Sequence, residues 1–287
     1  MVTSHFLSQG SCFTLPVRSD IPDALNIIVG AGRGCVLDAE SSIAGVWIPL
    51  RGRLQLSSGD QVAVGEIAAT EVESNLRVIG RGNALWVALL GPRGAWHRAL
   101  ESLSEIPIPD PVLLPARYVG DNTLRRSAIA VARAAAEGRA ETAVAGLIEN
   151  IHGLQSGLGP AIERCPGRTY VQRRQVFLRL QRVRNYVIAN AHRDLDNEEL
   201  ARIANYSPWQ FIRAFRSAYA QTPHAFVIEQ RLRRAQRLLS TSSLSIAEIA
   251  AASGFEDRCA FSRLFSERFG VTARAFRRET SIARLVA

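Results

Sequence analysis

The chain has 287 residues, of which 47% are hydrophobic and 21% are charged. This length favours two domains, and this composition is ordinary for a chain that folds around apolar cores, so wholesale disorder is excluded. The longest nearly unbroken apolar run, 84–90, is far shorter than the roughly 20 residues that cross a bilayer, and residues 1–5 lack the pattern of a secretory signal. We therefore expect a soluble, cytoplasmic protein without a membrane partner.

Charge is distributed unevenly along the chain, and every basic side chain is an arginine. Residues 1–170 hold 15 arginines against 16 acidic residues, a net charge of −1, whereas residues 171–287 hold 20 against 10, a net charge of +10. Codon usage in a high-GC genome would explain the choice of arginine but not its segregation. The C-terminal part is therefore expected to bind a polyanion, either nucleic acid or an anionic membrane surface.

Residues 12–91 alternate short apolar runs with turn signals. Short strands joined by tight glycine turns predict an antiparallel sandwich or barrel. The apolar runs are 25–29, 46–50, 54–56, 62–64, 76–79 and 85–90, and the breaks are 51–52, 58–60 and 81–83.

Helices are expected after these strands. We predict one over 93–102 and a helical hairpin from 123–136 and 141–154, with an extended, proline-rich connector at 106–111 before the hairpin. One face of the hairpin's second helix carries an apolar stripe that suits either an intramolecular core or a dimer seam. The stripe consists of Val144, Leu147, Ile148 and Ile151.

These features divide the chain into four parts. Residues 1–105 form the first, and 106–156 hold the connector and the hairpin. The glycines and prolines of 157–170 predict a linker, and 171–287 look helical throughout. The apolar face of the first helix in this last part is Val176, Leu180, Val183 and Val187. The fold class is therefore multidomain α+β, with an all-α C-terminal domain.

A repeat of about fifty residues runs through the helical part. At an offset of 49, Glu199 recurs as Glu248, and at an offset of 50, Phe211 recurs as Phe261. Each copy begins with an N-cap acceptor three residues before a Glu, at 196–199 and 245–248, which predicts two capping boxes. A short helix, a turn of small residues and a longer helix follow, which is the pattern of a helix-turn-helix unit.

The longer helix of each copy separates into an apolar face and an outward face. An outward Trp209 and Ile212 suit thymine methyl groups, and Arg213 and Arg263, at equivalent positions, suit guanine O6 and N7. Any one of these residues alone is equally well explained as a solvated charge or a packing residue, but their repetition favours DNA contact. The candidate DNA-binding residues are Trp209, Ile212, Arg213 and Arg216 in the first copy and Arg258, Cys259, Ser262 and Arg263 in the second.

A long helix over 225–240 is predicted between the two copies. It contains the basic run 231–237 and would hold the two outward helices at a fixed distance. Two such helices meet successive major-groove segments when they are about 34 Å apart.

Several segments resemble one family of regulators. Residues 249–255 (IAAASGF), 261–265 (FSRLF) and 269–273 (FGVTA) resemble the signature of the AraC/XylS-type transcription regulators, and 231–239 (RLRRAQRLL) is similar to that family's linker helix. The match covers roughly 174–278 and departs from the family at Ala273, usually proline, and Ser266, often basic. The resemblance implies binding of double-stranded DNA in the major groove, with the candidate residues, Arg216 excepted, at base-contacting positions.

The N-terminal part is similar to the family's cupin-type sensor domain, most clearly at 46–52 (VWIPLRG). The resemblance implies an effector-sensing domain, a small-molecule effector, contact with RNA polymerase, a homodimer formed through the hairpin, and activation of transcription. Metal-binding cupins present an H-x-H pair, and His5, His97 and His152 stand alone in the sequence. We therefore expect no cofactor, no metal and no catalytic residue.

Two other classes of protein stay open as alternatives. One is an enzyme, either a cupin catalyst or a DNA alkyl acceptor, that carries a DNA-binding domain. Alkyl transfer needs an activated thiolate, and the cysteines are scattered without a C-x-x-C pair or clustered partners. These are Cys12, Cys35, Cys165 and Cys259. The other alternative is a non-specific architectural DNA-binding protein.

Overall fold

The computed structural model describes residues 2–15, 24–39, 42–57, 61–72, 75–103, 113–119 and 122–286, with side chains as far as residue 280. The chain forms two compact units, Met1–Glu163 and Arg164–Ala287. The division falls within 157–170, and the connector expected at 106–111 lies outside the described residues. None of the helices in the described ranges has the length and apolar character needed to span a membrane.

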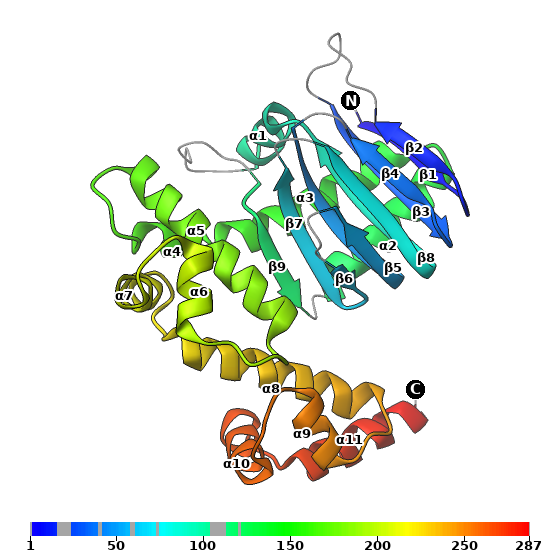
Figure 1. The fold of residues 1–287 in the computed structure, drawn as a ribbon. Helices are drawn as coiled ribbons and strands as arrows, with labels where there is room; N and C mark the ends of the chain where they lie inside the picture. Colours follow the sequence, from blue (N-terminus) through cyan, green and yellow to red (C-terminus); the bar gives the residue numbers. More distant parts are fainter. Residues whose placement is uncertain are drawn as a thin grey trace. The chain divides into compact units, whose positions relative to one another are not determined.

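The first unit is built on one sheet, in which the described strands follow the order β1-β3-β8-β5-β7-β9. Off this path, β2 pairs with β4, β4 with β8, and β6 with β5. The strands are β1 (Val2–Leu7), β2 (Cys12–Leu15), β3 (Leu25–Gly32), β4 (Val36–Ala39), β5 (Ile43–Leu56), β6 (Gln61–Ala63), β7 (Glu66–Val72), β8 (Leu76–Gly91) and β9 (Ala116–Val119). Figure 1 shows them as one twisted layer.

The topology corrects two expectations. Most neighbouring strands are antiparallel, as predicted, but β1 is parallel to β3 and β2 is parallel to β4. Parallel neighbours need a long crossover, and here the chain passes through a further strand before it returns. Among the described strands the sheet is also not closed, because β1 and β9 stand at the two ends of the path, so the prediction of a barrel was wrong.

The glycines predicted as breaks at 51–52 and 81–83 lie inside the long strands β5 and β8. The pairing of the two strands shifts between Pro49 and Arg51 and again between Arg51 and Arg53. Gly52 lies there with a φ of +74°, a conformation that glycine adopts without steric cost. The chain is therefore bulged rather than reversed, which sequence alone did not distinguish.

The bulge exchanges the two faces of β5. Before it, even-numbered residues such as Val46 and Ile48 pack toward the helices, while Trp47 faces the opposite core. After it, the even-numbered Leu54 and Leu56 join Trp47 in that opposite core. Because side chains alternate strictly along a strand, the extra residue is what moves them to the other face.

Helices α1 (Arg93–Glu101), α2 (Asn122–Ala136) and α3 (Ala140–Ser156) match the predicted helices, and a short α4 (Gly159–Glu163) follows. The three helices share a core with one face of the sheet, and Figure 1 shows α2 and α3 against that face. The stripe of α3 takes part in this core: Val144, Leu147 and Ile151 are buried and Ile148 is partly buried. Its intramolecular role, one of the two alternatives, is thus observed.

The opposite face of the sheet encloses a second core around two tryptophans. Trp47 and Trp86 are fully buried, and their indole rings lie 6.3 Å apart. Each indole N–H has a partner, since Trp47 Nε1 donates to Thr70 Oγ1 at 2.8 Å and Trp86 Nε1 donates to Cys35 Sγ at 3.3 Å. Large side chains with satisfied polar atoms therefore fill the inside of the curved sheet.

The second unit is helical, as predicted. Its helices are α5 (Tyr170–Asn190), α6 (Asn197–Ala204), α7 (Pro208–Tyr219), α8 (Pro223–Thr241), α9 (Ile246–Ala252), α10 (Arg258–Phe269) and α11 (Ala273–Val286). In α5, Phe177 is buried and Val176 only partly so, while the other three predicted face residues are buried. In Figure 1, α8 lies between the group α5–α7 and the group α9–α11.

The repeat seen in the sequence is repeated in the packing of aromatic rings. Phe215 lies 5.6 Å from Phe211 and 5.8 Å from Phe226, measured between ring centroids. Fifty residues later, Phe265 lies 5.6 Å from Phe261 and 6.0 Å from Phe276. The two helix-turn-helix units are therefore built around the same aromatic cluster, which fixes which face of α7 and α10 is turned inward.

Gly52→Ala tests the bulge. A Cβ at Gly52 would lie 2.9 Å from both Ala84 Cα and the Arg81 carbonyl oxygen, whereas a Cβ at Gly65 (φ +84°) would meet nothing within 4 Å. We expect Gly65→Ala to cost about 1 kcal/mol for its backbone alone and Gly52→Ala about 2–4 kcal/mol, because crowding adds to the same backbone cost. Urea unfolding of both variants measures the difference, and equal losses would contradict the close approach at Gly52.

Candidate nucleic-acid interface

Helix α7 begins at a capping box that fixes its first turn. Ser207 is the N-cap, its hydroxyl oxygen accepts from the Gln210 backbone N–H at 3.4 Å, and Gln210 Oε1 accepts in return from the Ser207 N–H. Pro208 occupies the first helical position, where its missing N–H costs nothing. The signal, a serine three residues before a glutamine, is present in the sequence but was missed. It places Trp209 in the first turn of the helix.

The two faces of α7 are as predicted from the sequence. Phe211, Ala214, Phe215 and Ala218 are buried against the unit. On the opposite face Trp209 is 67% exposed, Arg213 and Arg216 are exposed, and Ile212 is half-buried. An indole exposed to this extent is unusual for a large apolar side chain, so the outward face of α7 has a character that packing within the unit does not explain.

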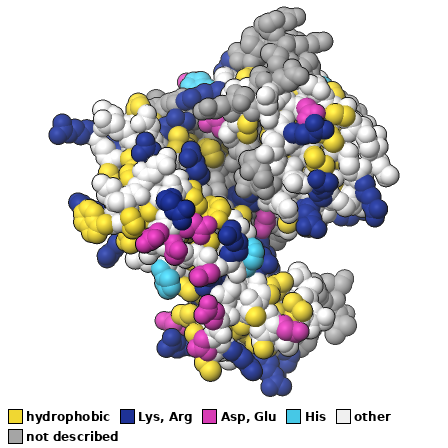
Figure 2. All heavy atoms as spheres, viewed as in Figure 1, with side chains coloured by type: hydrophobic (Ala, Val, Ile, Leu, Met, Phe, Trp, Pro, Cys, Tyr) yellow, Lys and Arg dark blue, Asp and Glu magenta, His cyan; other side chains and the backbone are white. Residues whose placement is uncertain are grey.

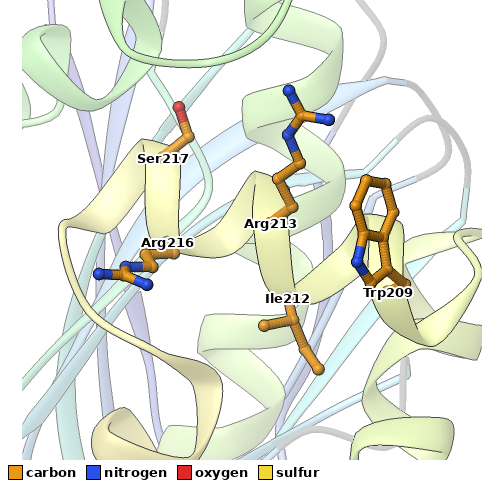
Figure 3. A pocket seen from close by; sticks show the side chains of 5 residues that line it. All are labelled: Trp209, Ile212, Arg213, Arg216 and Ser217. Carbon is orange, nitrogen blue, oxygen red and sulfur yellow. The ribbon is translucent and has the colours of Figure 1, made fainter.

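The outward side chains of α7 line an open hollow (Figure 3), which consists of Trp209, Ile212, Arg213, Arg216 and Ser217. The Arg213 guanidinium carbon lies 5.4 Å from the centre of the Trp209 ring. A cation–π contact at an exposed site is worth about 0.5–1 kcal/mol, enough to favour one orientation of the guanidinium. Figure 3 shows the two side chains next to each other, with Arg216 one turn further along.

Ser217 also lines the hollow, although it was not singled out from the sequence. It lies four residues after Arg213 and therefore on the same face of α7. Its hydroxyl donates to the Arg164 carbonyl oxygen at 2.7 Å, and Arg164 Nε donates to the Ala218 carbonyl oxygen at 3.0 Å. These two bonds tie the first residue of the second unit to α7, so Ser217 helps to hold the end of the hollow.

Helix α10 presents the second set of candidates. Its N-cap is Asp257, whose carboxylate accepts from the backbone N–H groups of Cys259 at 2.8 Å and Ala260 at 3.2 Å. All four candidate side chains of this helix are exposed, while Phe261 and Phe265 are buried beneath them. The exposed set is Arg258, Cys259, Ser262 and Arg263.

The candidate arginines differ from the arginines of α8 in their partners. Within the described part of the chain, the guanidinium groups of Arg213, Arg216, Arg258 and Arg263 form no ion pair or hydrogen bond with a protein group. By contrast, the α8 arginines are engaged: Arg233, for example, pairs with Glu229 at 2.7 Å. Figure 2 shows basic and acidic side chains interspersed on one face of the molecule. The outward faces of α7 and α10 therefore carry guanidinium groups that no carboxylate or carbonyl group in the described residues engages.

The two predicted capping boxes differ. At α9, Ser245 and Glu248 form a complete box, because Ser245 Oγ accepts from the Glu248 N–H and the Glu248 carboxylate accepts from the Ser245 N–H at 2.7 Å. At α6, Asp196 accepts from the Glu199 N–H at 2.6 Å, but the Glu199 carboxylate accepts from the Tyr186 hydroxyl instead. The first box is thus only half formed, since a tertiary partner on α5 competes for Glu199.

Hydrogen bonds lower the pKa of the Glu248 carboxyl below its ordinary value, first the bond from the Ser245 backbone N–H and then the bond from its side chain. Elsewhere, burial raises the pKa of the Cys165 thiol to about 11, which keeps that thiol protonated and unreactive. In the residues that the structure describes, no three His, Cys, Asp or Glu side chains gather to hold a metal ion.

Comparison with known proteins concerns the second unit. A family model described as a helix-turn-helix domain matches residues 200–279. The MmsAB operon regulatory protein of Pseudomonas aeruginosa is 31% identical over 104 residues, which are 36% of this chain and 34% of that protein. The transcriptional activator NphR of a Rhodococcus species is 34% identical over 101 residues, 35% of this chain and 30% of that protein. The chain thus spans about a third of the length of these curated relatives.

Among solved structures, the DNA-binding domain of AdpA in complex with a target DNA is 33% identical, covers 38% of this chain and 97% of that chain, and superposes with a TM-score of 0.36.

Replacement of Glu248 tests the complete capping box. Glu248→Ala removes the acceptor for the Ser245 N–H and should lower the melting temperature by a few degrees, whereas Glu248→Gln keeps an acceptor and should lower it less. The lowered pKa of Glu248 adds stability that is fully present above the ordinary carboxyl pKa and is lost as the pH falls through the lowered value. Thermal melts of the three proteins between neutral and acidic pH check both effects, and a Gln variant with the wild-type pH dependence would contradict the assignment.

Proposed function

The chain belongs to the AraC/XylS family of helix-turn-helix transcription regulators, and from that premise we propose that it binds specific sequences of double-stranded DNA and thereby activates transcription. The observation that carries this proposal is the pair of outward helix faces on α7 and α10. The fifty-residue repeat relates the two faces, and each carries an arginine without an ion-pair partner among the described residues at the equivalent position, Arg213 on α7 and Arg263 on α10. The family comprises transcription regulators and not enzymes.

Each outward helix is proposed to enter the major groove, which is wide enough for an α-helix. Arg213 and Arg263 would donate two hydrogen bonds each to guanine O6 and N7, and the exposed Trp209 with Ile212 would contact thymine methyl groups. The contact between Trp209 and Arg213 supports this division, because the indole supplies apolar surface and also orients the guanidinium beside it. Arg216, Arg258, Cys259 and Ser262 complete the surface.

The first unit is proposed to be a sensory or regulatory domain over 1–105, followed by the connector and hairpin of 106–156, a linker over 157–170 and the DNA-binding domain of 171–287. A small-molecule effector would need a site outside the space that Trp47 and Trp86 occupy. A homodimer would use a surface other than the α3 stripe, which the unit's own core already covers. Contact with RNA polymerase belongs to the same proposal, as does a cytoplasmic location, where DNA and polymerase are accessible.

Selection of bound fragments from random DNA with the purified full-length chain tests sequence specificity. A specific regulator enriches a defined motif in two parts, one for each outward helix. A non-specific architectural protein binds all sequences with a similar affinity that depends mainly on salt. Recovery of unenriched DNA at moderate ionic strength would therefore overturn the proposal in favour of that alternative.

Arg213→Ala and Arg263→Ala test the base contacts. Loss of a bidentate contact to guanine should weaken binding to the selected motif by about 1–3 kcal/mol and relax base preference at one part of the motif. Arg125→Ala removes the same charge from an exposed position on α2 and serves as the matched control. Titrations on the motif and on random DNA separate the effects, because a phosphate anchor would weaken binding to both equally.

A fragment that begins at Arg164 tests the independence of the second unit. Such a fragment retains both hydrogen bonds between Arg164 and α7 and the capping box of Thr169 with Gln172 at the start of α5. We expect residues 164–287 to fold cooperatively and to bind the selected motif within about threefold of the full chain, since no base contact is removed. A fragment that does not fold would refute the proposed boundary.

A further inference from the structure

Two arginines of α8 join the two helix-turn-helix units instead of facing the solvent. We propose that Arg231 and Arg234 are positioning residues that clamp the two units together, and that this clamp fixes the spacing between the two DNA segments they contact. The inference rests on the proposed function, since spacing has meaning only for a protein that binds DNA through α7 and α10.

Arg231 contacts the C-terminal end of α5, on the side of the first helix-turn-helix unit. Its Nε donates to the carbonyl oxygen of Ala191, the C-cap of α5, at 2.8 Å, and its Nη2 donates to the Arg193 carbonyl oxygen at 3.0 Å. The last carbonyl groups of a helix have no partner inside the helix and carry partial negative charge. One guanidinium thus satisfies the C-cap oxygen of α5 and a second oxygen in the segment that follows it, which fixes α8 against the C-terminal end of α5.

Arg234 makes the equivalent contact with the second helix-turn-helix unit. One turn further along α8, its Nε donates at 3.0 Å to the carbonyl oxygen of Ala252, the last residue of α9. Residues three apart lie on the same face of a helix, so the two arginines leave α8 from neighbouring positions. Both side chains are half-buried, and the bonds from Arg231 Nε and Arg234 Nε are partly buried, which makes these two charge-assisted bonds less exposed to solvent than surface ion pairs.

The two helix-turn-helix units also touch directly at Gly254, in the turn that follows α9. Gly254 has a φ of +93°, and a Cβ there would lie 3.0 Å from the Ala191 carbonyl oxygen, 3.0 Å from His192 Cα and 2.9 Å from Arg231 Nε. No side chain fits in this space. The backbone of the turn at Gly254, in the second helix-turn-helix unit, therefore packs against the end of α5 and against Arg231, which caps α5. The junction is therefore closed, and a hinge has no room at this point.

A further ion pair places α10 relative to α8. Glu229 on α8 lies 3.7 Å from Arg268 in the last turn of α10 and also pairs with Arg233 on its own helix. Arg268 and Arg233 are about half exposed, so these pairs contribute less than the partly buried bonds of Arg231 Nε and Arg234 Nε. The clamp consequently depends on Arg231, Arg234 and the glycine between their targets.

A rigid junction has a specific consequence for DNA binding. Each base pair inserted between two target segments moves the second by about 3.4 Å and rotates it by about one tenth of a turn. Two helices held in one body cannot follow that shift without loss of contacts, whereas two loosely joined units can. The clamp therefore predicts that the protein accepts one spacing, and that this selectivity, rather than base preference, is lost when the clamp is opened.

The test compares the full-length wild type with the double variant Arg231→Gln, Arg234→Gln. Fragments selected from random DNA should show two subsites at one spacing for the wild type, and the same subsites at several spacings for the variant. Insertion of one base pair should weaken binding about tenfold for the wild type, the loss typical of one mismatched position, and less than about threefold for the variant. Arg233→Gln, which removes an exposed charge from the same helix, should keep the wild-type spacing.

The outcomes separate the clamp from the proposed function. If the wild type enriches two subsites and the double variant keeps the same single spacing at lower affinity, the clamp is overturned while DNA binding stands. If the wild type enriches no two-part motif, the proposed function itself fails. Should the double variant not fold in thermal melts, Arg234→Gln alone decides, because it removes the bond to the end of α9 and leaves both bonds of Arg231 in place: a broadened spacing supports the clamp and an unchanged one overturns it.

Discussion

A helix that uses one face to hold its own domain together can offer only the opposite face to a ligand. In the second unit this constraint is set twice, by Phe211 and Phe215 on α7 and by Phe261 and Phe265 on α10. Because the aromatic clusters have closely similar ring separations, the two helices present equivalent outward faces. The exposure of Trp209 and the free guanidinium groups follow from this arrangement, since neither the core nor an acidic neighbour covers them.

The arginines of residues 164–287 fall into two groups that the sequence does not distinguish: some are exposed on the outward helix faces, and others bind carbonyl groups at helix ends. The guanidinium groups of Arg213, Arg216, Arg258 and Arg263 on the outward faces have no carboxylate or carbonyl partner in the described residues and are available to phosphate or base. Arg231 and Arg234 are directed instead at the carbonyl ends of α5 and α9. The net charge of the unit therefore overstates the charge that faces DNA. What the α8 arginines contribute is a defined arrangement of the two outward helices.

In the first unit, residues 1–163, the two faces of one sheet contribute to two separate hydrophobic cores. The bulge at Gly52 exchanges the faces of β5, so that one strand serves the helix-covered core at its start and the tryptophan core at its end. The buried tryptophans occupy the inside of the curved sheet, and the α3 stripe covers the other face. Regulation by this unit must accordingly use surfaces other than these two filled interiors.

The sequence by itself determined what depends on neighbours within a few residues. These features are the helix caps at Ser245 and Asp196, the inward and outward faces of α7 and α10, and the repeat that relates the two units. Periodicity and capping act over one or two turns, so they are visible in a single chain.

Only the tertiary structure decided which distant groups meet. It directed Glu199 to Tyr186 instead of completing a capping box, paired β1 with β3 in parallel, continued β5 and β8 through their glycines, and engaged two α8 arginines at helix ends. Each of these outcomes is a competition between a local partner and one that the chain reaches only after folding. The local sequence shows which donors and acceptors are present, but which of them form hydrogen bonds depends on the distances between them in the folded chain.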